Sequence, residues 1–370
     1  MSFNSWIKNS ITEEKFTQRS QLNLLAKDLN FILLQMGSLW ENLRNKRLFI
    51  TGATGFFGCW LLESFLWANE KLSLNATVTL LTRHKASFVN RYPHLAQNST
   101  FTFLEGDVSN FTFPKEQFDF IIHAATDVGA SLDKVKLLST WNTIVDGTKR
   151  VLEFAAYSQA KQILLTSSGA VYGKQTPELS HLLESHSCEL KLDEGYSTYA
   201  VGKFAAEYLS VLYAKQYNLD IKIARCFTFI GPYLPLTANF AIAQFIRSGL
   251  RGEDIIINGD GSPYRSYLYA ADLVIWLWTI LFKGQILRPY NVGSDQAISI
   301  KELALIVSSC FDSKPQVKIM KPATGALPER YVPNVQRAQV ELGLTQQISL
   351  VQAIQTTINW YTSFGKNYAG

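Results

Sequence analysis

R-L-F-I-T-G-A-T-G-F-F-G, residues 47–58, is the stretch that decides the fold. The apolar run at 48–51 predicts a buried strand, and three glycines follow it at G-x-x-G-x-x-G spacing. Gly52 suits the tight turn, Gly55 the close approach of a pyrophosphate, and Gly58 the packing of a helix on the strand. The amphipathic run at 59–66 predicts that helix, whose N-terminal N–H groups would face phosphates. The unit predicts a dinucleotide site, and the alternative is a tight turn without a ligand. We assign to this site Gly52, Thr54, Gly55, Phe56, Phe57 and Gly58.

Downstream, short apolar runs alternate with helical or irregular segments. Strands are predicted at about 77–81, 100–104, 118–122, 162–167 and 221–225, and helices at 135–158 and 199–217. This alternation is typical of a parallel sheet covered on both faces, so we expect an α/β, Rossmann-type doubly wound sheet. Several of these strands end in small or polar residues, at the edge where such sheets bind their ligands.

The pattern changes near residue 231, where prolines and glycines interrupt the alternation. Helices are predicted at 238–250, 271–281, 299–310 and 350–364, with a strand at 290–292. We therefore expect three parts: an N-terminal helical extension (1–46), the Rossmann domain (47–230) and a smaller C-terminal α/β substrate lobe (231–370). Leucines at helical spacing in the extension predict an amphipathic helix that pads the core or contacts a partner.

Composition excludes several classes of function. The 370 residues carry a net charge of +5 with the basic residues scattered, so no nucleic-acid surface is expected. The four cysteines lack metal-ligand spacing, which predicts no metal site and buried thiols in a reducing compartment. No apolar run reaches the ~18 residues of a membrane span, and the polar N-terminus does not read as a signal peptide. We expect a cytoplasmic protein.

Candidate catalytic residues follow the middle strands. Tyr199 and Lys203 stand four apart, which places them on one face of a helix. An ammonium near a phenol lowers the phenol pKa, and such a phenol can exchange a proton with a sugar hydroxyl. Upstream, L-L-T-S-S-G-A-V-Y-G at 164–173 places hydroxyls at the end of a buried strand. The alternative is a surface Tyr–Lys pair.

With these elements in this order, the chain resembles the extended short-chain dehydrogenase/reductase family of nucleotide-sugar epimerases and dehydratases, over about residues 47–362. The resemblance implies a nucleotide-diphosphate sugar as substrate and a homodimer formed by the segment 149–156 and the Tyr199 helix. It also implies roles for individual residues: Ser168, Tyr199 and Lys203 in catalysis, with Ser168 also on the substrate and Tyr199 and Lys203 also at the cofactor, where the lysine holds the nicotinamide ribose. Asp107 and Val108 would lie beside the adenine, Ala124 and Ala125 along the cofactor, and Arg265 and Arg330 on the substrate diphosphate.

Two departures from the family pattern refine the expectation. The second strand ends in Thr82-Arg83-His84-Lys85 without a carboxylate, which favours NADP over NAD because Arg83 can face a 2′-phosphate. Dehydratases carry Asp-Glu where this chain has Gly169-Ala170, and the glutamate usual in sugar-acid decarboxylases is missing too. Hydride transfer at C4 of the sugar is therefore expected, giving epimerisation or reduction of a 4-keto sugar.

Two alternatives stay open. A 4,6-dehydratase would need a carboxylate from the loop, and Glu178, Glu184 and Asp193 are the candidates. A non-catalytic dinucleotide-binding regulator would be expected to lack Tyr199 or Lys203, and both are present.

Overall fold

A seven-stranded parallel sheet forms the centre of the protein, in a computed structural model that describes residues 24–126, 137–187, 197–323 and 325–364. The strand order is β11-β6-β5-β4-β1-β2-β3. The strands are β1 (Arg47–Thr51), β2 (Thr77–Thr82), β3 (Phe101–Glu105), β4 (Phe120–His123), β5 (Gln162–Ser168), β6 (Asp220–Cys226) and β11 (Pro289–Val292). The order reverses between β1 and β4, which is where doubly wound sheets bind ligands. The predicted α/β fold class is confirmed.

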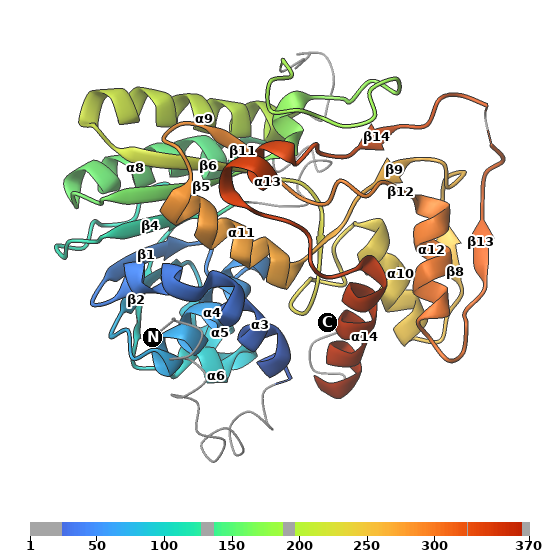
Figure 1. Cartoon of the computed structure of the whole chain (residues 1–370), viewed down its shortest axis with the longest axis horizontal. Coiled ribbons are helices and arrows are strands. Elements are labelled where there is room, and N and C mark those ends of the chain that lie inside the picture. Colours follow the sequence, from blue (N-terminus) through green and yellow to red (C-terminus); the bar gives the residue numbers. More distant parts are fainter. Residues whose placement is uncertain (1–23, 127–136, 188–196, 324, 365–370) are drawn as a thin grey trace.

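Helices cover both faces of this sheet (Figure 1). On one face lie α4 (Phe56–Lys71) and α11 (Ala270–Lys283), packed on side chains such as Ile50 and Leu164. On the other lie α8 (Gly147–Tyr157) and α9 (Ser197–Tyr217), packed on side chains such as Phe49 and Ile121. Because alternate side chains of a strand point to opposite faces, strands buried on both faces read as continuous apolar runs.

The N-terminal extension covers the core. Helix α3 (Ala26–Met36) packs on α4 and α11, and the 3₁₀ turn η2 (Gly37–Leu43) packs on α11. The Tyr269 hydroxyl donates to Asp28 at 2.7 Å, and the Trp40 and Trp278 rings meet edge to face at 5.5 Å. The described part of the extension therefore pads the core, which is the first of the two roles that the sequence left open.

The smaller elements gather on the right in Figure 1. They comprise α10 (Ala241–Leu250), α12 (Ile300–Ser309), α14 (Leu350–Phe364) and the strand pair β8 (Ile255–Ile257) and β13 (Val317–Ile319). A second small sheet has the order β12 (Ile298–Ser299), β9 (Tyr264–Arg265), β14 (Arg330–Tyr331). A last pair joins β7 (Phe229–Ile230) to β10 (Leu268–Tyr269). Strand β11, which the sequence analysis placed in the smaller lobe, pairs with β6 at the edge of the large sheet.

Other elements differ from the expected ones. The helix expected at 135–158 is divided, within the described residues, into α7 (Leu137–Trp141), a π-helical turn η5 (Asn142–Asp146) and α8. Gly147 begins α8, and a Cβ there would lie 2.8 Å from Val108, so this turn packs unusually close to the loop that follows β3. The short helices α5 (Lys85–Arg91), α6 (Pro93–Ala96) and α13 (Gln336–Leu342) were not expected. Within the described part of the chain, no helix has the length and apolarity needed to cross a membrane.

Candidate active site

The glycine turn brings the ends of β1 and β4 into contact. Gly52 has a φ of 70°, and a Cβ on it would lie 2.5 Å from the carbonyl of Ala124. A Cβ on Gly58 would lie 2.3 Å from the backbone of Ala53. Both positions exclude a side chain, one because of the turn and the other because the helix packs so closely on it.

Gly55 differs from these two glycines because the space beside it is open. A Cβ there would have only the carbonyl oxygen of Gly52 nearby, at 3.5 Å. Gly55 caps α4, whose first N–H groups have no acceptor within the helix and suit a phosphate. Thr54 is exposed here, whereas the Phe56 and Phe57 rings pack on the core, Phe57 against Phe229 at 5.1 Å. The two phenylalanines can therefore offer a phosphate their backbone N–H groups only, and the turn fits a dinucleotide.

Arg83 and Asp107 lie near one another at the ends of β2 and β3. Partial burial alone would raise the Asp107 pKa, but hydrogen bonds from Ser109 and the nearby Arg83 cation outweigh it, so the pKa is lowered. Arg83 is exposed, whereas the Lys85 ammonium lies over the Phe103 ring at 5.3 Å. Of the basic cluster, Arg83 is therefore the side chain that interacts with Asp107.

Behind the turn, His123 joins β1 and β4 to α8. Its Nδ1 lies 2.8 Å from the Thr51 hydroxyl and its Nε2 lies 3.0 Å from the Thr148 hydroxyl. Thr148 donates to a main-chain carbonyl and so accepts from Nε2–H, whereas Thr51 accepts from the Ala125 N–H and so donates to Nδ1. Burial, followed by the Lys203 charge, lowers the His123 pKa to about 3, which agrees with a neutral ring.

This arrangement fixes the backbone beside the glycine turn. Ala124 and Ala125 both donate to Thr51, through N–H bonds of 3.2 Å. Both alanines are half-buried, whereas Val108 is buried in the core. The two alanines therefore border the open space at the turn, and Val108 supports it from within.

Ser168, Tyr199 and Lys203 come together at the end of β5. The Ser168 hydroxyl accepts from the Ala170 N–H at 3.2 Å and lies near the Tyr199 phenol. The Lys203 side chain is buried, its ammonium donates to the Thr166 carbonyl at 2.9 Å, and it lies 5.8 Å from the centre of the Tyr199 ring. Positions four apart on α9 do share one face, as the sequence predicts.

The ionisation of this pair differs from the expectation. Burial raises the Tyr199 pKa, and the nearby Ser168 hydroxyl offsets only part of that rise. The expected lowering by Lys203 is not found, because the ammonium is directed to Thr166 and burial dominates. Burial also lowers the Lys203 pKa to about 8. Tyr199 therefore keeps its proton, and Lys203 loses its proton more readily than an exposed lysine does.

A buried ion pair contacts the carboxyl end of β5. Ser167 donates to Glu207 at 2.5 Å, and the Arg225 guanidinium binds the same carboxylate through Nε and Nη2 at 3.0 and 2.8 Å. Arg225 also lies over the Tyr172 ring at 4.8 Å. Because Ser167 precedes Ser168, this pair holds the strand end in place.

The sheet β12-β9-β14 brings Arg265, Arg330 and Tyr331 to the same region. Tyr331 pairs with Arg265 in the β9–β14 register, and the Arg330 guanidinium lies over the Tyr264 ring at 4.3 Å. Both arginines are half-buried, so their heads can reach a ligand. The Tyr331 phenol lies near Ser168 and Tyr199. The two arginines thus belong to the same small sheet as a tyrosine that lies near the candidate catalytic serine.

Gly169 leaves a space that two aromatic side chains fill. A Cβ on Gly169 would lie 2.6 Å from the Phe227 ring and 2.7 Å from the Tyr331 hydroxyl. Of the loop carboxylates, Glu178 is exposed, Glu184 accepts from the Asn291 N–H at 2.9 Å, and Asp193 lies outside the described residues. Neither described carboxylate takes the place of the missing pair.

Sequence reasoning missed His123, Glu207 and Tyr331 as site residues. His123 and Glu207 carried no spacing signal, because their partners lie on other strands and helices. Tyr331 stood in a family-like segment, but its position near Ser168 depends on a pairing between strands of two residues each.

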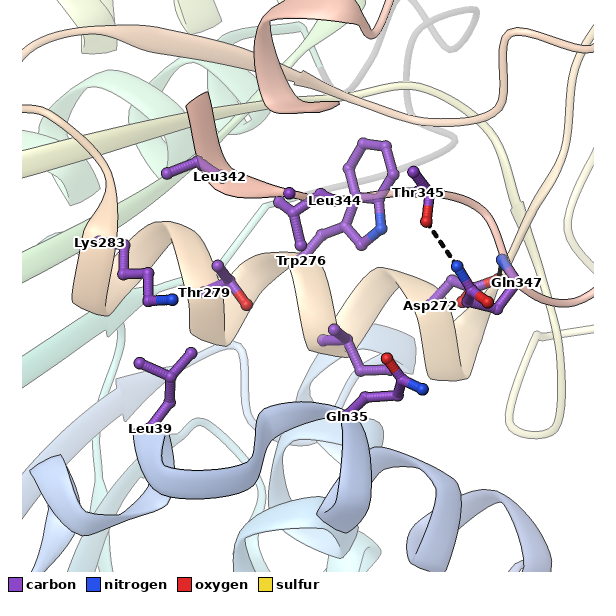
Figure 2. Close-up of a pocket in the computed structure, with 12 residues that line it drawn as sticks. Gln35, Leu39, Asp272, Trp276, Thr279, Lys283, Leu342, Leu344, Thr345 and Gln347 are labelled. Carbon is purple, nitrogen blue, oxygen red and sulfur yellow. Dashed lines mark hydrogen bonds between the residues drawn. The ribbon is translucent and has the colours of Figure 1, made fainter. Parts of the chain in front are cut away.

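A small cavity of about 110 Å³ lies elsewhere, between α3, α11 and the segment that leads from α13 to α14 (Figure 2). Asp272 and Gln347 lie close together at its edge, and Trp276 and Leu344 form its wall. Burial raises the Asp272 pKa to about 6. The cavity shares no residue with the candidate site, so we assign it no part in the reaction.

Comparison with known proteins gives a consistent result. The model of the "NAD dependent epimerase/dehydratase family" matches residues 48–293. UDP-glucuronic acid decarboxylase 6 of Arabidopsis thaliana is 30% identical over 311 residues, or 84% of this chain and 87% of that protein.

Two solved structures show the same fold. UDP-glucuronic acid 4-epimerase from Bacillus cereus, in complex with NAD, has a TM-score of 0.74 at 20% identity, over 87% of this chain and 98% of that one. dTDP-glucose 4,6-dehydratase from Bacillus anthracis, also in complex with NAD, has a TM-score of 0.71 at 18% identity, over 87% and 98%. The chain therefore belongs to the NAD dependent epimerase/dehydratase family, the extended short-chain dehydrogenase/reductase enzymes of nucleotide sugars that its sequence resembles.

Proposed function

We propose that the protein transfers hydride at C4 of a nucleotide-diphosphate hexose, as an NAD(P)-dependent epimerase or as a 4-keto-sugar reductase. The observation that carries the proposal is the group Ser168, Tyr199 and Lys203 at the carboxyl end of β5, within the sheet edge that holds the glycine turn. A dinucleotide at that turn supplies the hydride acceptor or donor.

The side chains divide the work at the sugar hydroxyl. Ser168 hydrogen-bonds the reacting oxygen and Tyr199 takes or returns its proton. Lys203, whose ammonium donates to the Thr166 carbonyl, is placed to hold the nicotinamide ribose beside the phenol. Arg265 and Arg330 bind the substrate diphosphate, for which a planar guanidinium is well suited.

Loss of water from C5–C6 is disfavoured, because that reaction needs a base and an acid within reach of the sugar. The packing of Phe227 and Tyr331 against Gly169 leaves no space for a side chain there. The 4,6-dehydratase is thus the weaker alternative. A non-catalytic regulator is weaker still, because the catalytic group is complete.

Decarboxylation of a nucleotide uronic acid is a second candidate, and the observation in its favour is the 30% identity to a UDP-glucuronic acid decarboxylase. It too would begin with oxidation at C4. Against it stands Ala170, which supplies no acid or base.

For the cofactor we propose NADP over NAD. Arg83 is exposed at the end of β2 and is free to turn toward a 2′-phosphate. The test is the pair of dissociation constants for the two cofactors.

We propose a homodimer whose seam is formed by α9. Phe204, Tyr208 and Leu212 form an exposed apolar stripe at successive turns, and Tyr208 is 60% exposed. In the segment 149–156 the apolar side chains, such as Val151 and Phe154, face the core of the same chain, so α9 supplies most of the seam. A cytoplasmic location is also proposed, because Cys59, Cys226 and Cys310 are free thiols.

The test is incubation with a panel of nucleotide sugars, with and without NADPH, read by mass and proton spectra. An inverted or reduced C4 supports the proposal; a product lighter by one water or by carbon dioxide points to the dehydratase or the decarboxylase. Tyr199→Phe should abolish turnover and retain cofactor binding, because it removes the proton-transfer group alone. Near-normal turnover of that variant would reject the assignment.

A further inference from the structure

One buried carboxylate joins helix α9 to the end of strand β5. Glu207 lies one turn after Lys203 on α9, so the two side chains share a face of the helix, and both are buried. The Ser167 hydroxyl, on β5, donates to Glu207 at 2.5 Å. The Lys203 ammonium donates to the carbonyl of Thr166, the residue before Ser167, at 2.9 Å. Two successive turns of α9 are therefore bonded to two successive residues of β5.

Arg225, on the neighbouring strand β6, holds the other side of this carboxylate. Its Nε and Nη2 donate to Glu207 Oε1 and Oε2 at 3.0 and 2.8 Å, in the forked geometry that suits a carboxylate. Arg225 also pairs with Ser167 in the β5–β6 register, and its guanidinium lies over the Tyr172 ring at 4.8 Å. Both oxygens of Glu207 thus have fixed partners, so the carboxylate can act through position and not by contact with a ligand.

The apolar contacts beside these bonds form only a small cluster. Ala206, on α9, packs with Leu165 of β5 and with Ile144 of the π-helical turn. Apolar attraction is non-directional, so a cluster of this size does little to fix how far α9 lies along the strand. The polar bonds to Thr166 and Ser167 supply that direction.

We propose that Glu207 is a positioning residue, which holds the face of α9 that carries Tyr199 and Lys203 at a fixed place along β5, the strand that ends in Ser168. The inference rests on the proposed function insofar as it takes these three side chains as the reacting groups. Proton exchange needs the reacting atoms close to their productive geometry, and a misplacement of ~1 Å can lower turnover about 100-fold. Glu207 would therefore affect the rate of the reaction more than the affinity for its ligands.

The test removes the bond between helix and strand and keeps the ion pair. Glu207→Ala would leave the buried Arg225 guanidinium without a counter-charge and would destabilise the whole fold. Ser167→Ala breaks the bond to β5 alone. Ser210→Ala is the matched control, because Ser210 is fully buried on the same helix and its hydroxyl donates to the Ala206 carbonyl at 2.9 Å, within α9. Each variant loses one buried hydroxyl, and only Ser167→Ala breaks a contact between α9 and the sheet.

Steady-state kinetics with a turned-over nucleotide sugar gives the first readout. In Ser167→Ala we expect kcat to fall about tenfold, because a hydrogen bond to a charged group is worth at least that factor. The KM for the sugar and the dissociation constant of the cofactor should change little, because the Ser167 hydroxyl is buried against Glu207. Ser210→Ala should keep the constants of the wild type. An unchanged kcat in Ser167→Ala, or an equal fall in Ser210→Ala, would overturn the inference.

A second readout does not depend on turnover. Carbon NMR of protein with labelled lysine follows the ionisation of Lys203, whose signal is assigned by its absence in Lys203→Met. Burial lowers the Lys203 pKa to about 8, so an α9 that is loosened from β5 should admit water and move this titration to higher pH. The titratable groups beside Lys203 include His123, Cys226 and Glu207, and both variants keep them.

The two readouts separate this inference from the proposed function. We expect the Lys203 titration to move upward in Ser167→Ala and to stay in place in Ser210→Ala. If the wild type turns over no nucleotide sugar, the proposed function fails, and the titration still decides on Glu207. A Lys203 titration in Ser167→Ala equal to that of the wild type would show that Glu207 does not hold α9 in place.

Discussion

Replacing Lys203 by methionine should abolish turnover and stabilise the fold. Lys203 is 4% exposed, and burial lowers its pKa from 10.5 to about 8. The difference corresponds to about 3 kcal/mol by which the fold disfavours the charged form. Methionine fills similar space without a charge but gives up the bond to Thr166, worth about 1 kcal/mol. The net gain is about 2 kcal/mol, or about 3 °C in melting temperature for a chain of this length.

The pH dependence provides the sharper test. Below pH 8 the lysine is charged in the folded and unfolded chains, so the folded wild type bears the whole desolvation cost. Between about 8 and 10.5 the folded chain has released the proton and the unfolded chain retains it, so the wild type gains stability as pH rises. The advantage of the variant should therefore be widest below pH 8 and shrink toward pH 10.5.

Denaturant unfolding of both proteins across this pH range is the assay. Lys222→Met is the matched control, because Lys222 is also 4% exposed but its ammonium lies 2.5 Å from Asp220. Removing that cation leaves a carboxylate unpaired, so the control should lose stability at pH 7. A Lys203→Met protein less stable than the wild type at pH 7, or a difference that stays constant with pH, would refute the reasoning.

Two further predictions concern the cofactor and the assembly. Arg83→Ala should raise the dissociation constant for NADP(H) about tenfold or more and change that for NAD(H) little, because the charge-assisted bond to a 2′-phosphate is lost. Lys85→Ala is its control, and equal weakening for both cofactors would count against Arg83. Tyr208→Glu should convert the dimer to a monomer, because the substitution would bury an unpaired charge in the seam. Light scattering measures this change in mass. Met320→Glu, at an exposed site directly after β13, should keep the mass of the dimer, and a monomeric wild type at micromolar concentration would reject the seam.

The sheet could be predicted because its signals are local. A strand buried on both faces reads as an apolar run, and the glycines at 52 and 58 mark a turn that admits no side chain. The strand that forms β11 was also predicted, but its place at the edge of the large sheet was not. Strand order depends on contacts between segments far apart in the chain, which periodicity does not record.

The chemistry of the site was less accessible to sequence reasoning. The spacing of Tyr199 and Lys203 predicted their shared face correctly, but the sign of the Tyr199 pKa shift was wrong because burial at the end of β5 exceeds any effect of the ammonium. The apolar segment 149–156 suggested an outward face, and its side chains instead fill the core beneath α8. An apolar pattern predicts that a helix has a buried face, but it does not identify the segment that covers this face.

The packing of α3 on α11 has a consequence for the order in which the chain is made. Asp28 and its partner Tyr269 are 241 positions apart. At ordinary translation rates, a ribosome needs about 10 to 50 seconds to make the chain between them. A helix of 11 residues is only marginally stable alone, so in that interval the side chains of Leu29, Ile32 and Leu33 have no complete core to enter. The first helix of the described chain is therefore among the last to finish folding, and until then it offers an apolar segment to chaperones.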